Sequence, residues 1–115
     1  MVELCKFSGE IVNKVNDGLI TDYYGRGLYI ISGESILNWN TRSVLYKYDG
    51  YYLRDFYGKI MYSFDGNEFK DFSGKILFTY KNNKIAKFAG LNEYFIKPNA
   101  SNIVVASLIA LFVNK

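Results

Sequence analysis

The chain has 115 residues, of which 50% are hydrophobic and 18% are aromatic, and these values exclude an intrinsically disordered chain and predict one domain. Its formal net charge is +3, with fourteen basic and eleven acidic residues. Because these charges nearly balance, a nucleic-acid partner is not expected.

An aromatic residue recurs along the chain every sixteen or seventeen positions, which indicates an internal repeat. The repeated positions are Phe7, Tyr23, Trp39, Phe56, Phe72 and Phe88. A glycine follows two positions later in every unit except the third, where Thr41 stands instead. A second turn signal comes about eight residues further on, as at Asp65 and Gly66. Each unit therefore contains two turns.

Each unit predicts a β-hairpin. Asp-Gly and Ser-Gly pairs supply the positive φ that two-residue hairpin turns require. The runs between the turns are rich in Tyr, Phe, Ile and Leu and are typical of strands. We predict an all-β fold in which residues 2–97 form an antiparallel meander of about twelve short strands, curled or barrel-like. A solenoid of parallel sixteen-residue coils is the alternative, and the turn chemistry disfavours it.

The alternation of residues predicts which face of the meander forms the core. One stripe contains Tyr29, Tyr46, Tyr62 and Phe78 together with Ile36, Leu53, Phe69 and Ile85. If Asp65 and Gly66 are the central turn residues, Tyr62 lies opposite Phe69. The third unit reads "WNTRSV" and has one additional residue, which predicts a bulge or a longer turn.

The period ends after Pro98, and residues 101–113 predict a helix whose N-cap is Asn99, Ser101 or Asn102. Residues 103–113 are apolar on all sides, so this helix must be buried on all sides. The meander either closes around the helix as a ring, or the helix packs between two subunits. Residues 1–115 are thus expected to form a single repeat domain. The start "MVELCKF" lacks a secretory signal, so we expect a cytoplasmic location.

The stretch "YDGYYLRDFYGKIMYSFDGNEFKDFSGKILFTY", followed by an apolar C-terminal helix, resembles short bacterial repeat proteins of unknown function and the 4-fold β-flower proteins. The resemblance covers roughly residues 7–96. It implies an all-β repeat fold with a central cavity or core, and it brings no catalytic residues. The chain departs from that family because it has about six hairpin units instead of four, and the sixth is degraded.

Catalytic and metal-ligating chemistry is not expected. The chain has no histidine, which is the commonest general base and a common zinc ligand. Its single cysteine, Cys5, is expected to be a small buried residue in a strand. Asp22, Asp55 and Asp71 recur at the repeat period. We expect them to pair with basic residues on neighbouring strands, namely Arg26, Arg54, Lys59 or Lys75. We therefore predict no enzyme activity, no cofactor and no metal.

The sequence predicts a non-catalytic structural or interaction module with a protein partner or a second copy of itself. The alternative is a protein that binds a glycan or a small ligand through exposed aromatic rings. The candidate ligand-binding residues are Trp39, Tyr51, Tyr24 and Arg54. A third hypothesis is membrane docking or pore formation through the C-terminal helix. A membrane partner is not expected, because eleven apolar residues are too few for a bilayer, which needs roughly twenty.

Overall fold

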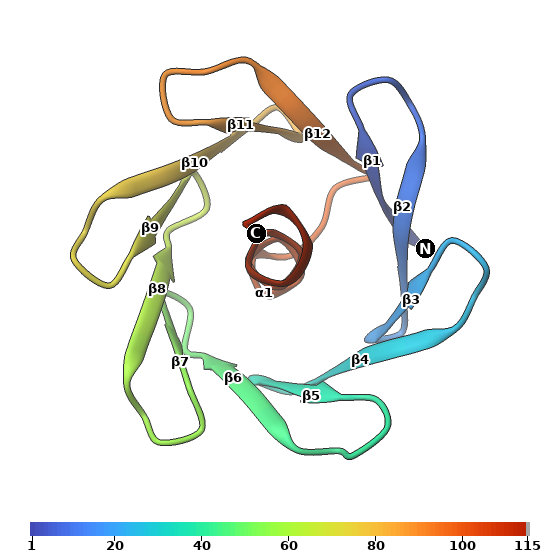
Figure 1. The fold of residues 1–115 in the computed structure, drawn as a ribbon, viewed down its shortest axis with the longest axis vertical. Coiled ribbons are helices and arrows are strands. Elements are labelled where there is room, and N and C mark those ends of the chain that lie inside the picture. The colour runs from blue at the N-terminus through green and yellow to red at the C-terminus, as the bar shows by residue number, and fades with distance from the viewer. Residues whose placement is uncertain (115) are drawn as a thin grey trace.

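The computed structural model describes residues 1–114 and forms a ring of twelve antiparallel strands around a central helical segment (Figure 1). Each strand pairs with the next along the chain, and β12 pairs with β1. The strands are β1 (Val2–Lys6), β2 (Ile11–Asn16), β3 (Leu19–Asp22), β4 (Gly27–Ser32), β5 (Ser35–Asn38), β6 (Val44–Tyr48), β7 (Tyr52–Arg54), β8 (Ile60–Phe64), β9 (Glu68–Asp71), β10 (Ile76–Lys81), β11 (Lys84–Lys87) and β12 (Asn92–Lys97). This closed meander confirms the predicted all-β fold and excludes the parallel solenoid.

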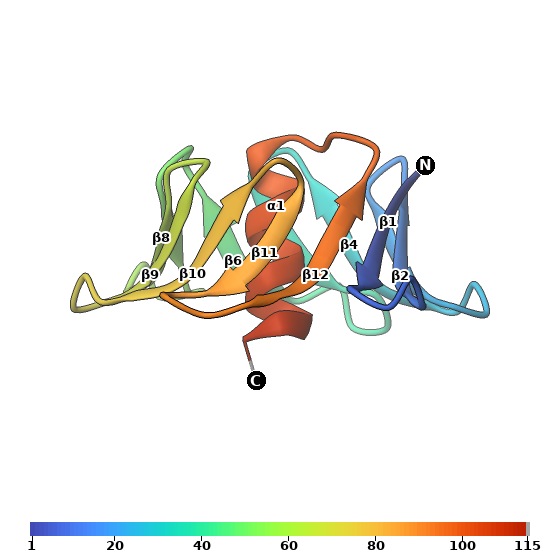
Figure 2. The same cartoon turned by 90° about the horizontal axis from the view of Figure 1, so that it is seen from above.

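The ring is a flat disc of 36 × 34 × 21 Å from which six hairpins project like petals. The petals are the strand pairs β1–β2, β3–β4, β5–β6, β7–β8, β9–β10 and β11–β12. Each petal has a shift in strand register, for example between Leu53 and Arg54. Such β-bulges bend a strand. The bulges therefore mark where each hairpin leaves the barrel wall and turns outward, as Figure 2 shows.

We call the outer ends of the petals the tips and count each one from the aromatic residue of its repeat to the next strand. The tips are residues 7–10, 23–26, 39–43, 56–59, 72–75 and 88–91. All but one have four residues, and the tip at residues 39–43 has five. Arg42 within this tip has a φ of 62°. The inserted residue of the third unit therefore lies in a longer turn, as the sequence predicted.

The petals are joined at the opposite end by five wall turns, which connect β2–β3, β4–β5, β6–β7, β8–β9 and β10–β11. Asn82 and Asn83 form a two-residue turn with φ values of 51° and 64°. The turn at Asp65 is longer, and Phe64 pairs with Phe69.

The predicted pairing of Tyr62 with Phe69 is therefore wrong, because Tyr62 pairs with Asp71. The carboxylate of Asp65 accepts hydrogen bonds from the backbone N–H groups of Asn67 and Glu68, both at 2.8 Å, and this lengthens the turn. The register moves by two residues, so each side chain keeps the predicted face.

Neighbouring petals are tied together by a repeated backbone hydrogen bond at the wall turns. The N–H of Ile31 donates to the carbonyl of Gly18 at 2.7 Å, and four equivalent bonds follow around the ring. A Cβ at Gly18, whose φ is 83°, would lie 2.5 Å from the carbonyl oxygen of Ile31. This close approach requires glycine.

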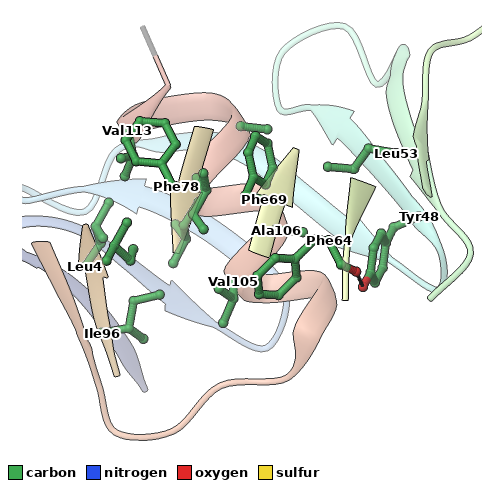
Figure 3. Packing of buried hydrophobic residues seen from close by; sticks show 14 of the residues in the cluster. Leu4, Tyr48, Leu53, Phe64, Phe69, Phe78, Ile96, Val105, Ala106 and Val113 are labelled. Atoms are coloured by element: carbon green, nitrogen blue, oxygen red, sulfur yellow. Dashed lines mark hydrogen bonds between the residues drawn. The ribbon is translucent and has the colours of Figure 1, made fainter. Parts of the chain in front are cut away.

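The predicted stripe lines the inside of the ring. Ile36, Leu53, Phe69 and Ile85 are fully buried, and Phe78 is nearly so. The other stripe residues, Tyr29, Tyr46 and Tyr62, are half-buried and pack against the core. Figure 3 shows Phe64, Phe69 and Phe78 gathered beside the helical segment. The predicted core face is thus confirmed.

The centre of the ring is filled by α1 (Asn102–Leu108), which continues as one π-helical turn, η1 (Ile109–Val113). Val105, Ala106, Leu108 and Ile109 have no exposed surface. The ring closes around the helix within one chain, which is the first of the two predicted arrangements. Ser101 is the N-cap, without a capping side-chain hydrogen bond. Among residues 1–114, no helix has the length and apolar character needed to cross a bilayer.

Candidate functional site

The tips carry most of the exposed apolar surface of the protein. Ten large hydrophobic side chains are exposed among residues 1–114, and eight of them lie in the tips. These eight are Phe7, Tyr23, Tyr24, Phe56, Tyr57, Phe72, Phe88 and Leu91. Tyr24 and Tyr57 are 87% and 89% exposed. The concentration of exposed aromatic rings in five of the six equivalent tips marks the tips as the candidate site.

The tips splay outward on the side of the disc at which η1 ends (Figure 2). A groove of about 360 Å³ is lined by Lys75, Phe88 and Asn114, so the end of the helical segment adjoins two tips. We call the six tips and this end of the helical segment the tip face.

Four of the six tips are shaped by the Asp or Asn side chain that precedes them. The Oδ1 of Asp55 accepts hydrogen bonds from the backbone N–H groups of Tyr57 and Lys59, both at 2.9 Å. Asp22 and Asp71 form the same pair of bonds in their tips. Asn38 replaces the aspartate in the third unit and bonds two backbone N–H groups in the same way. The periodic acidic residues therefore form turns.

The predicted pairing of the periodic aspartates with basic residues is confirmed for Asp22, whose Oδ2 lies 3.1 Å from the Nε of Arg26. Within residues 1–114, Asp55 and Asp71 form no ion pair, and their carboxylates bond the backbone of the tips instead. The pKa of Asp22 is lowered mainly by the hydrogen bond from the backbone N–H of Arg26. The hydroxyl of Ser73 is the main cause that lowers the pKa of Asp71. Asp therefore recurs in the sequence because its carboxylate accepts hydrogen bonds from the backbone N–H groups of the tip that follows.

Most of the charged residues in the tips are basic. Four of their residues are basic (Arg26, Arg42, Lys59 and Lys75), and Glu10 is the only acidic one. The Glu10 carboxylate lies 3.2 Å from the Nζ of Lys6. The tips therefore combine exposed aromatic rings with an excess of positive charge.

The structure separates the four ligand-binding residues that the sequence predicted. Tyr24 and Trp39 occupy neighbouring tips, at residues 23–26 and 39–43. Trp39 is half-buried because its ring lies over Gly27, where a Cβ would come within 2.8 Å of the indole, and the Arg42 guanidinium lies 4.3 Å from the ring centroid.

Tyr51 lies at the wall turn between β6 and β7, whereas Arg54 is the last residue of β7 and its guanidinium donates to the carbonyl of Gly58, in the following tip, at 3.3 Å. The ring of Tyr51 meets that of Tyr52 edge-on at 4.6 Å, and Arg54 lies 5.3 Å from the Tyr52 ring. The Nε of Arg54 is also 3.9 Å from the Asp49 carboxylate. Tyr24, Trp39 and Arg54 therefore lie in or beside three different tips, and Tyr51 lies at a wall turn. Their role in ligand binding stays a prediction.

Sequence reasoning missed most of the aromatic residues of the tips. The ligand-binding residues predicted from the sequence include Tyr24 and Trp39 but not Phe56, Phe72 or Phe88. A signal was present, because each of these residues precedes a glycine by two positions and so belongs to a turn.

A groove also lies between the first two petals, near the tips. Its volume is about 500 Å³, and it is lined by Gly9, Glu10, Ile11, Tyr23 and Tyr24. The rings of Tyr23 and Tyr24 meet edge-on at 5.3 Å. The groove thus has aromatic rings and one carboxylate at its border.

The described residues show no arrangement for metal or thiol chemistry. Within residues 1–114, no three potential metal-ligating side chains come together. Cys5 is fully buried, as predicted, and burial raises the pKa of its thiol. A neutral, inaccessible thiol is a poor nucleophile.

A scan of the chain against protein-family models, curated proteins and solved structures gives no match. Proposals about function therefore rest on the geometry of the tip face.

Proposed function

We propose that this protein is a non-catalytic interaction module that binds its partner through the tip face. The observation that carries the proposal is the placement of eight of the ten exposed large hydrophobic side chains in the tips. Exposed apolar patches of this kind mark interaction sites on soluble domains. Tyr, Phe and Trp are also the residues that contribute most to binding surfaces.

The barrel holds the tips in fixed positions before binding. The β-bulges set the outward bend of each petal, and the Asp or Asn hydrogen bonds fix the loop that follows. A preformed loop loses less conformational entropy when it binds. Burying one Phe side chain contributes about 1.5–3 kcal/mol, so a few tips suffice for a specific contact.

Photo-crosslinking in the cells that produce the protein tests this proposal. A photoreactive amino acid replaces Tyr57 in a tip, and in a control chain it replaces Lys84, which is exposed beside a wall turn. We expect crosslinked adducts from position 57 and few from position 84. Equal yields at the two positions, or no adduct at either, would contradict the proposal.

A second candidate function is glycan binding in the groove between the first two petals. The groove of about 500 Å³ has Tyr23 and Tyr24 on its border together with Glu10. Sugar rings stack on aromatic faces, and carboxylates accept hydrogen bonds from sugar hydroxyls.

An oligosaccharide array tests the glycan hypothesis. We expect Tyr24→Ala to abolish binding to any sugar on the array that the wild-type chain binds. Tyr57→Ala is the matched control, because it removes an equally exposed tyrosine outside this groove. An array without bound sugars, or equal losses for the two variants, would eliminate this candidate.

A further inference from the structure

The geometry points to a specific partner for the tip face: we infer that it docks on the surface of an anionic lipid bilayer. This inference rests on the proposed function and names its partner. Two features of the tips carry it, namely the type and distribution of the exposed apolar residues and the sign of the charge among them.

The apolar residues have the character of membrane-interface anchors. Seven of the eight are Phe or Tyr, and the eighth is Leu91. Aromatic rings prefer the boundary between headgroups and acyl chains. The exposed residues occur in five of the six tips around the disc, and the remaining tip carries half-buried Trp39. A ring of anchors on one side of a flat disc fits a planar surface better than it fits an extended peptide (Figure 2).

The charges of the tips complement anionic headgroups. Arg26, Arg42, Lys59 and Lys75 are spread over four tips, and all four are exposed. The only acidic tip residue, Glu10, is paired with Lys6. Basic residues that lie close to a membrane with anionic lipids are attracted by its negative surface potential.

The residues directly before the tips carry both signs of charge, because Asp22, Asp55 and Asp71 are acidic and Lys6 and Lys87 are basic. Counted together with the tips, they give six basic and four acidic residues, so a smaller excess of positive charge remains. Apolar insertion and basic attraction together supply the two signals that stable peripheral binding requires.

The contact proposed here is separate from the C-terminal helix. The expectation against a membrane partner was based on the length of that apolar segment, which the barrel encloses as its core. The tips lie outside the core and bind without any loss of internal packing. The proposed complex is therefore peripheral, with the barrel intact above the membrane.

Co-sedimentation with lipid vesicles tests the inference on the full chain. The vesicles contain phosphatidylcholine alone or with about 30% phosphatidylglycerol. We expect binding to the anionic vesicles that weakens as salt is added, and little binding to the neutral ones. Trp39, the only tryptophan, reports the contact because its emission should shift to the blue in the bound state.

Paired variants separate a specific face from general electrostatic attraction. Lys59→Glu with Lys75→Glu reverses two charges in the tips, whereas Lys81→Glu with Lys84→Glu makes the same change beside a wall turn. We expect the first pair to weaken binding at least about tenfold and the second to have a much smaller effect. Tyr57→Ser with Phe72→Ser should also weaken binding, although it leaves every charge in place. Circular dichroism verifies that each variant is folded.

Equal binding to neutral and anionic vesicles, or equal losses for the two charge-reversal pairs, would overturn the inference. An absence of vesicle binding would overturn it as well. If position 57 nevertheless crosslinks to a protein or a glycan in cells, the proposed function stands without a membrane partner. If position 57 gives no adducts and vesicles do not bind, both proposals fall.

Discussion

Tyr48 shows how one side chain joins neighbouring units of the ring. Its hydroxyl donates to the carbonyl of Phe64 at 2.6 Å, across a distance of sixteen residues in sequence, and lies 3.0 Å from the carbonyl of Gly50. Figure 3 shows this bond at the edge of the core. Burial of the ring is the main cause that raises the pKa of Tyr48 to about 12.

This pKa predicts how stability depends on alkaline pH. In the unfolded chain Tyr48 ionises near its ordinary pKa of 10.0, so the folded state is favoured below pH 10 and loses stability between pH 10 and about 12. We expect Tyr48→Phe to lower the free energy of unfolding at pH 8 by about 1–2 kcal/mol and to reduce the alkaline slope. Denaturant unfolding from pH 8 to 11 measures both. An unchanged slope in the variant would refute the assignment to Tyr48.

The aspartates before the tips allow a second test at the scale of single residues. Asp55→Ala removes two hydrogen bonds to backbone N–H groups, and we expect it to lower the free energy of unfolding by about 1 kcal/mol. Asp55→Asn should be nearly neutral, because Asn38 makes equivalent bonds in the third unit. Thermal unfolding compares the two variants. If both lose the same stability, the charge of Asp55 matters more than its turn-forming oxygen.

At the scale of elements, the sequence predicts strands, faces and the helix, but not register or exposure. The positions of Gly74 and Asp65 predict turns because few residues adopt the required backbone conformations. Alternation assigns Phe69 and Ile85 to the core because a shift of two residues preserves the face. The alternation that identifies the core does not report the bulges that aim the tips outward, so the exposure of residues such as Phe72 does not follow from the stripe.

The candidate site was predicted only in part for the same reason. Tyr24 and Trp39 were recognised as aromatic residues in or beside turns, and both lie in tips. Tyr51 is also an exposed tyrosine but lies at a wall turn, and Arg54 lies at the end of β7 beside a tip. Which end of a hairpin a residue occupies depends on how the ring closes, and ring closure is a property of the whole chain.

The helical segment offers a test of the core. Leu108 has no exposed surface, and Leu111 is half-buried three residues later in the same segment. We expect Leu108→Ala to lower the free energy of unfolding by about 3 kcal/mol through lost burial and a residual cavity. Leu111→Ala is the control and should lose clearly less. Chemical denaturation measures both values, and equal small losses would show that the helix is not the centre of the core.

At the scale of the whole molecule, closure of the ring couples the two ends of the chain. β1 pairs with β12, and the Nζ of Lys97 lies 3.7 Å from the Glu3 carboxylate. An open repeat array loses a terminal unit with limited damage to the rest, whereas a closed ring is left with two free edges and an uncovered core. Deletion of residues 1–16 should therefore abolish the cooperative thermal transition. A truncated chain that keeps a sharp transition near the wild-type temperature would show that closure is dispensable.

The central claim is that a rigid barrel, built around its own helix, binds through the tips. Amide hydrogen exchange, measured with and without anionic vesicles, tests both parts at once. We predict that residues 103–113 exchange slowest in both states and that vesicles protect segments spaced sixteen or seventeen residues apart, at the tips. Protection centred on the wall turns, or rapid exchange of the helical segment in the free protein, would contradict the account.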